Sequence, residues 1–201
     1  ARDTHVAMLT LLPPAVEPDD TNARDIVIVL DCSGSMMGDS IALAKEGVQL
    51  GLGSLSPAER FAVMGFGSKF EHFDSEFQPA NRKNIELARK FVSNLGNLGG
   101  TELSEALELA LAYSDDHPMD ILLLTDGEVW KIDEVTKKAK KKGIRIFTIG
   151  IGSAVAEDTV RALADQTGGA CELVSPNEEM SSRIFRHFNR MRQPETARLA
   201  I

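Results

Sequence analysis

Short runs of aliphatic residues alternate along the chain with longer segments in which apolar residues recur every three or four positions. The apolar runs have the length and composition of strands. They cover Ile26–Leu30, Phe61–Phe66, Met119–Thr125, Ile144–Ile149 and Ala170–Val174. The first, third and fourth runs are nearly uninterrupted Ile, Val and Leu, as expected of strands that helices cover on both faces. The alternation therefore predicts an α/β fold with a mostly parallel sheet.

Six segments between and after these runs have the apolar spacing of amphipathic helices. They are Ile41–Leu55, Asn84–Leu95, Thr101–Tyr113, Ile132–Lys142, Val155–Thr167 and Glu178–Met191. We predict a Rossmann-like, doubly wound sheet of order 3-2-1-4-5-6 flanked by about six helices, with a short antiparallel edge strand over Lys69–Asp74. Gly47, Gly51 and Gly53 lie inside the first helix and cost about 1 kcal/mol each relative to Ala. We expect close packing of this helix on the sheet to offset that cost.

The two ends of the chain depart from this pattern. Within residues 1–23, the apolar run Val6–Leu12 is followed by three prolines, which we interpret as a strand and linker from the end of a preceding domain. Residues 24–192 contain all the alternating elements and are predicted to be one domain. Residues 193–201 are interpreted as an extension towards a following segment. With 201 residues, 43% of them hydrophobic, the chain can bury one substantial core without a metal or disulfide.

The net charge of the chain disfavours some classes of partner, and its cysteine content bears on the compartment. The formal net charge of −8 disfavours nucleic acid or an anionic membrane surface, because both require a basic face. No apolar run approaches the roughly 20 residues that span a bilayer, so we expect no direct membrane insertion. Cys32 and Cys171 are the only cysteines and fall in a central and an edge strand, so we expect two free thiols. Free thiols favour a reducing, cytoplasmic compartment.

Oxygen-bearing side chains follow the first predicted strand at alternate positions. Asp31, Ser33 and Ser35 come directly after Ile26–Leu30, and Gly34 allows the backbone to turn sharply. Ligands of open α/β sheets bind at the carboxyl ends of the strands. Hard cations such as Mg²⁺ prefer oxygen ligands. The loop is therefore a candidate metal site, although Ser and Gly are also common turn and helix-capping residues.

Two later segments bring further oxygen donors to the same edge. Thr101 follows two glycines at the start of a predicted helix, and Asp126 follows the strand Met119–Thr125. In the predicted strand order, Asp126 and Asp31 follow neighbouring strands at the topological switch point, and Thr101 enters the same crevice. Alone, Thr101 also fits a helix cap and Asp126 a turn residue. Their occurrence together in this chain order favours the metal site.

These segments resemble the metal-ion-dependent adhesion site of von Willebrand factor A (VWA) domains, which has Asp-x-Ser-x-Ser, Thr and Asp elements. The similarity covers about Arg24 to Arg192. The resemblance implies that Mg²⁺, with Mn²⁺ and Ca²⁺ as alternatives, is bound by five residues. These are Ser33, Ser35 and Thr101 through hydroxyl oxygens, and Asp31 and Asp126 directly or through bound waters. Residues 65–68 and 98–102 further resemble A domains that follow a VIT domain, as in inter-alpha-trypsin inhibitor heavy chains.

A cation held by neutral hydroxyls and two partly separated acids remains under-neutralised and attracts another anion. We therefore expect a protein partner that presents a Glu or Asp carboxylate, and an isolated domain that is monomeric. Met36, Gly100 and Glu128 are expected at the rim of this partner-binding surface; Glu128 also fits an ordinary exposed loop acid. The resemblance favours a secreted or cell-surface location, against the indication of the thiols, so the compartment stays open.

An enzyme is the main alternative from another class, with Asp31 as a phosphoryl-accepting nucleophile in a haloacid-dehalogenase-like fold. That chemistry pairs the Asp with a second acid two residues later, where this chain has Ser33. No Walker-type loop or dinucleotide fingerprint follows the first strand. We therefore expect a non-enzymatic, metal-dependent binding domain. The alternatives are a structural scaffold with a non-functional metal site and a metal-dependent hydrolase.

Overall fold

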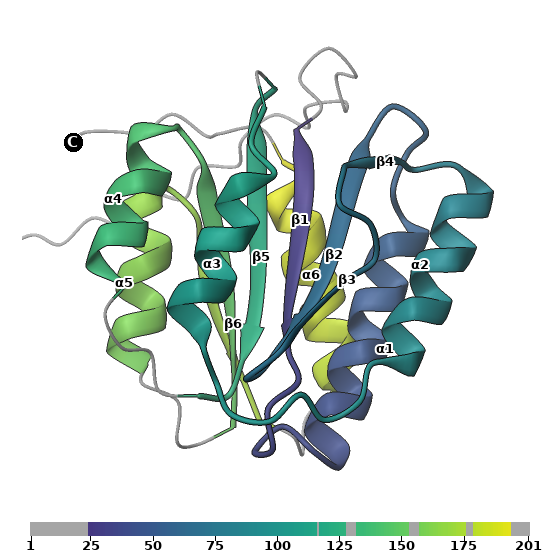
Figure 1. Cartoon of the computed structure of the whole chain (residues 1–201), viewed down its shortest axis with the longest axis horizontal. Helices are drawn as coiled ribbons and strands as arrows, with labels where there is room; N and C mark the ends of the chain where they lie inside the picture. The colour runs from purple at the N-terminus through teal and green to yellow at the C-terminus, as the bar shows by residue number, and fades with distance from the viewer. Residues whose placement is uncertain (1–23, 116, 128–131, 153–156, 176–178, 194–201) are drawn as a thin grey trace, which may run out of the picture.

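The structure of the chain is a computed structural model that describes residues 24–115, 117–127, 132–152, 157–175 and 179–193. The elements, shown in Figure 1, are in chain order β1 (Asp25–Asp31), α1 (Asp39–Gly53), β2 (Arg60–Phe66), β3 (Phe70–His72), β4 (Gln78–Pro79), α2 (Arg82–Asn94), α3 (Leu103–Ala112), β5 (Met119–Thr125), α4 (Asp133–Lys141), β6 (Arg145–Ile151), α5 (Glu157–Thr167), β7 (Cys171–Val174) and α6 (Met180–Met191). The strand predicted within residues 1–23 and the extension over 194–201 lie outside the described residues.

The sheet has the strand order β3-β2-β1-β5-β6-β7, and β4 pairs with β2 beyond this path. Strands β1, β2, β5, β6 and β7 are parallel, whereas β3 and β4 pair antiparallel with β2. The predicted order and the antiparallel edge strand are confirmed. The two-residue strand β4 was not predicted, because Gln78 and Pro79 carry no strand pattern and pair only through their position beside Arg60 and Phe61.

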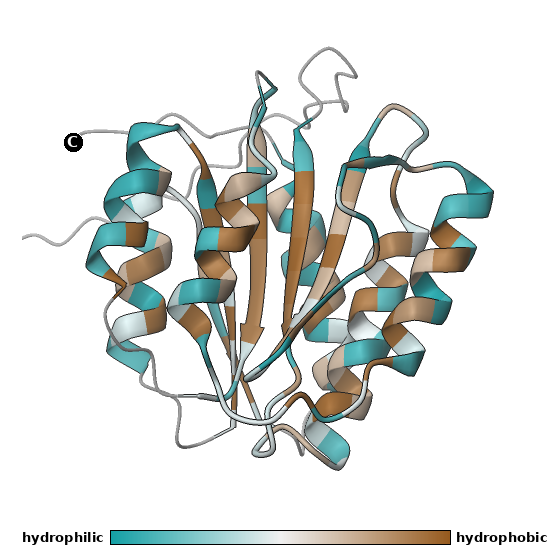
Figure 2. Ribbon diagram, in the orientation of Figure 1, coloured by the Kyte–Doolittle hydropathy of each residue, from teal (hydrophilic) through white to brown (hydrophobic). Residues whose placement is uncertain are grey.

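The central strands are mostly apolar because each of their faces is covered by helices. Ile26, Ile28 and Leu30 of β1 pack into one buried cluster, with residues of α1, α2 and α6. Val27 and Val29, which point the opposite way, pack into a second cluster with residues of α3, α4 and α5. Figure 2 shows the apolar centre of the sheet and the polar outer faces of the helices. Two layers of helices therefore enclose the sheet.

The glycines of α1 face another helix rather than the sheet. A Cβ on Gly47 would lie 2.7 Å from Cβ and Cγ2 of Ile184, and one on Gly51 would lie 3.0 Å from the ring of Phe188, both on α6. A Cβ on Gly53 would meet the guanidinium of Arg89 on α2. The expectation that packing on the sheet offsets the cost of these glycines is therefore wrong. Without side chains at these positions, α1 and α6 approach closely, and the buried side chains of α6 contact the backbone of α1.

Three smaller observations complete the fold. Both cysteines are free, Cys32 buried and Cys171 partly buried, as predicted. Near the amino ends of β5 and β6, the buried carboxylate of Asp120 accepts hydrogen bonds of 2.8 Å from Arg24 Nε and 2.9 Å from Arg145 Nε. Over the described part of the chain, no helix has the length and apolar character needed to cross a membrane.

Candidate metal centre at the carboxyl edge of the sheet

Three chain segments meet where β1 and β5 end. Residues 32–38 follow β1, residues 95–102 connect α2 to α3, and Asp126 and Gly127 follow β5. Strands β1 and β5 are adjacent and parallel, with Leu30 paired to Leu124, so the residues after both strands emerge side by side. The segment before α3 is tied to the loop after β1 by backbone hydrogen bonds from Leu98 N to Cys32 O (2.8 Å) and from Gly34 N to Gly99 O (2.9 Å).

Asp31 is the most buried acid of this edge, with a side chain fixed through both oxygens. Its Oδ1 accepts a hydrogen bond from the backbone N of Ser33 (2.9 Å), and its Oδ2 accepts one from the Thr125 hydroxyl (2.6 Å). The residue is 0% exposed. Burial raises the pKa of Asp31 despite these hydrogen bonds, which lower it, and the nearby Asp126 raises it further. A positive charge bound beside Asp31 would therefore stabilise its ionised carboxylate.

A chain of hydroxyl groups connects the loop after β1 to Asp126. The Oγ atoms of Ser33 and Ser35 lie 3.1 Å apart, and the Ser35 hydroxyl donates to Asp126 Oδ1 at 2.9 Å. Ser33 is buried whereas Ser35 is exposed, so the chain leads from the interior to the surface. Burial also raises the pKa of Asp126, and the hydrogen bond from Ser35 opposes this shift. The structure thus brings both carboxylates and both serine hydroxyls to one crevice.

Thr101 reaches the same crevice because Gly127 has no side chain. A Cβ on Gly127 would lie 3.0 Å from Thr101 Cγ2 and 3.7 Å from Asp31 Oδ2, so these two side chains flank the glycine. The loop that carries Thr101 is held from the other side by Ser68, whose Oγ accepts a hydrogen bond from Gly100 N at 2.8 Å. All the residues predicted as metal ligands therefore lie around one point of the sheet edge.

The residues predicted at the rim have different positions. Met36 is completely buried in the apolar cluster beneath α1, so its side chain does not reach a partner in this structure. Its neighbour Met37 is 36% exposed and lies at the surface instead. Gly100 is exposed, as a rim residue must be. Glu128 lies outside the described residues. The sequence did not reveal which of the two methionines faces the core, because the loop has no regular period.

Thr125 and Ser68 contact the candidate site, and sequence reasoning did not include them in it. Thr125 holds one oxygen of Asp31, and Ser68 holds the backbone before Thr101. The hydroxyl next to Asp126 was a usable signal for Thr125, because the end of a strand beside β1 must lie next to Asp31. Ser68 had no such signal, since its contact with Gly100 depends on the path of the loop.

The donor set fits a hard cation. Within the ranges that the structure describes, no three His, Cys, Asp or Glu side chains come together as a metal site. The crevice instead combines two carboxylates with hydroxyl groups, and oxygen donors of this kind suit Mg²⁺, Mn²⁺ or Ca²⁺. Burial, complete for Asp31 and partial for Asp126, raises the pKa of both acids, and this agrees with the binding of a cation.

The chain is a doubly wound α/β domain with an acidic, hydroxyl-rich crevice at the carboxyl edge of its sheet. Comparisons with known proteins identify the family that has this architecture. The sequence profile of the von Willebrand factor type A domain matches residues 24–173, and the chain belongs to this family. A von Willebrand factor A domain-containing protein of Dictyostelium discoideum is 32% identical over 182 residues, which are 87% of this chain and 20% of that protein. The chain thus spans about a fifth of the length of this curated relative.

Solved structures show the same fold at lower identity. A von Willebrand factor type A structure from Catenulispora acidiphila superposes with a TM-score of 0.74 at 21% identity, covering 85% of this chain and 42% of that one. Proximal thread matrix protein 1 from the mussel byssus, solved with a zinc-occupied MIDAS motif, superposes with a TM-score of 0.67 at 17% identity, covering 86% and 47%. The predicted VWA fold is confirmed. The similarity to the VIT-associated subfamily stays a prediction.

Proposed function

We propose that this domain binds a divalent cation at the carboxyl edge of its sheet and, through that cation, an acidic residue of a protein partner. The observation that carries the proposal is the convergence of Asp31, Ser33, Ser35, Thr101 and Asp126 around one crevice, with both carboxylates raised in pKa. Membership of the VWA family and the zinc-occupied site of the mussel relative support it.

The carboxylate and the hydroxyl groups of the crevice have different roles in the proposed binding. Asp31 is held by Thr125 and by the backbone of Ser33, so its oxygens are already oriented and little conformational entropy is lost on binding. Ser33 and Ser35 offer neutral oxygens, which leave part of the charge of a bound cation uncompensated. When bound, the cation would supply the positive charge that attracts a partner's carboxylate. The net charge of −8 otherwise repels such a group.

Catalysis is not part of the proposal. Histidine is the commonest general acid or base. Two histidines are engaged elsewhere, since His187 contacts Ala170 O and the imidazole of His72 contacts the Tyr113 hydroxyl. The position two residues after Asp31 carries a serine, not the proton-transferring acid of a phosphoryl-transfer site.

Isothermal titration of the metal-stripped chain with Mg²⁺ and with Mn²⁺ tests the proposal. We expect one saturable site that is lost in Asp31→Ala and unaffected in Asp39→Ala, since Asp39 is an exposed acid in the first turn of α1. Equal affinity in wild type and Asp31→Ala would refute the site. No binding by the wild type would favour a scaffold whose crevice is closed by the hydrogen bonds between Ser33, Ser35 and Asp126.

A further inference from the structure

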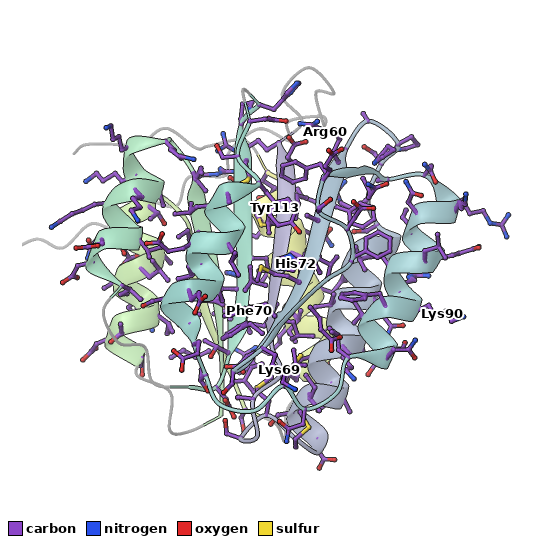
Figure 3. All side chains as sticks on the ribbon, in the orientation of Figure 1. Arg60, Lys69, Phe70, His72, Lys90 and Tyr113 are labelled. Atoms are coloured by element: carbon purple, nitrogen blue, oxygen red, sulfur yellow. The ribbon has the colours of Figure 1, made fainter. Side chains whose placement is uncertain are left out.

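Lys69 places a positive charge beside the candidate metal centre. The loops that form this edge comprise residues 32–38, 67–69, 95–102 and 126–127, and Lys69 is the one basic residue among these positions. It is exposed, and its ammonium forms no ion pair with any described residue. Figure 3 shows Lys69 at the end of the sheet where β1 and β5 finish, whereas Lys90 projects from the outer side of α2.

The backbone on both sides of Lys69 is fixed, on one side to the loop of residues 95–102 and on the other to the sheet. Ser68 N donates to Leu98 O (2.8 Å), and Ser68 Oγ accepts from Gly100 N (2.8 Å), directly before Thr101. On the other side, Phe70 pairs with Phe66 in the sheet and packs against the second apolar cluster. The base of the lysine side chain is therefore held close to Thr101, and its flexible four-carbon stem can turn towards a bound partner.

An exposed, unpaired lysine at this position gives the site a second point of attraction for anions. The other charged groups of these loops, Glu102 and Asp126, are acidic and repel a partner's carboxylate. For a partner segment with a single acid, only the attraction of the cation would oppose that repulsion. A segment with a second acid close by in sequence can pair it with Lys69 while the first acid reaches the cation.

We propose that Lys69 is a specificity-determining residue that selects partners with two neighbouring carboxylates, one for the bound cation and one for the Lys69 ammonium. This inference rests on the proposed function, because it needs a carboxylate at the metal. The contribution of an exposed ion pair is modest, corresponding to a factor of about 1.4 to 5 in affinity. Such a pair also weakens with salt, because exposed charges are screened.

Nuclear magnetic resonance titration of the ¹⁵N-labelled chain in Mg²⁺ tests this selection, since it detects weak binding. The probes are capped glycine peptides with one glutamate, and matched peptides with two glutamates separated by one to three glycines. A twofold preference for the diacidic peptides is statistical, because either acid can reach the cation. We expect a total preference of about three- to tenfold in the wild type, falling to about twofold in Lys69→Ala.

Lys90→Ala is the matched control, because it removes another exposed lysine that is remote from the site, and it should retain the wild-type preference. Mg²⁺-dependent binding of both peptides with the same preference in the wild type and Lys69→Ala would overturn the role of Lys69 and leave the proposed function intact. Binding of neither peptide, or equal binding after chelation of Mg²⁺, would overturn the proposed function and the inference with it.

Discussion

Replacing Gly47 by alanine tests the closest helix–helix contact of the fold. In an isolated or exposed helix, this change stabilises by about 1 kcal/mol, because glycine has the poorer helix propensity. Here the new Cβ would lie 2.7 Å from both Cβ and Cγ2 of Ile184. The Cβ atom is fixed by the backbone of α6, and Cγ2 is restricted because Ile strongly prefers one χ1 rotamer in a helix, so α1 and α6 must separate.

The sign of the effect follows from comparing the two terms. Overpacking of a well-packed interior typically costs 1–3 kcal/mol, and a contact at 2.7 Å to an atom fixed by the backbone belongs in the upper part of that range. Subtracting the gain in helix propensity leaves an expected net loss of about 1–2 kcal/mol in the free energy of unfolding. Gly47→Ala should therefore destabilise the domain, although the same change in an exposed helix stabilises.

Urea unfolding monitored by circular dichroism measures this difference, with two further variants as controls. Gly53→Ala displaces the Arg89 guanidinium from Gln49 O, and this loss opposes the gain in helix propensity, so the net effect should stay within about 0.5 kcal/mol. Ile184→Ala removes Cγ2 and Cδ1 but keeps Cβ, so it relieves part of the clash, and the double variant should show a favourable coupling of about 0.5 kcal/mol or more. A stabilised Gly47→Ala, or a cycle without coupling, would refute the close contact of α1 with α6.

Two buried polar side chains, those of His187 and Asp120, give further predictions. Burial lowers the pKa of His187 to about 4 from its ordinary 6.5, so the unfolded chain binds this proton more readily, and stability should decrease as the pH falls from 6.5 to 4. The loss should approach about 3 kcal/mol. His187→Gln should reduce it, and parallel urea stability curves for both proteins between pH 4 and 7 would contradict this. Asp120→Asn removes the negative charge that faces Arg24 and Arg145 and should cost about 3 kcal/mol in urea unfolding, whereas Glu86→Gln in the exposed pair with Arg82 should change stability by less than about 1 kcal/mol. Equal losses in the two variants would refute this ranking.

The sequence by itself determined all the described elements except β4, their order and the residues proposed for the candidate site. The apolar runs could be identified because a strand covered on both faces is apolar along its buried length, as residues 26–30 of β1 are. The site was readable because parallel strands end at one edge, which brings the residues after β1 and β5 together. Thr101 was readable as a third contributor because the chain must return to that edge before α3.

Only the tertiary structure decided which surfaces meet. Periodicity placed Gly47 inside a helix but did not identify its neighbour, because the contact with Ile184 joins α1 to the last helix of the described chain. The burial of Met36 and the hydrogen bond from Thr125 to Asp31 likewise depend on how loops and strands distant in sequence approach one another. The local sequence pattern indicates whether a residue is buried or exposed. Which residue it contacts depends on the packing of the whole domain.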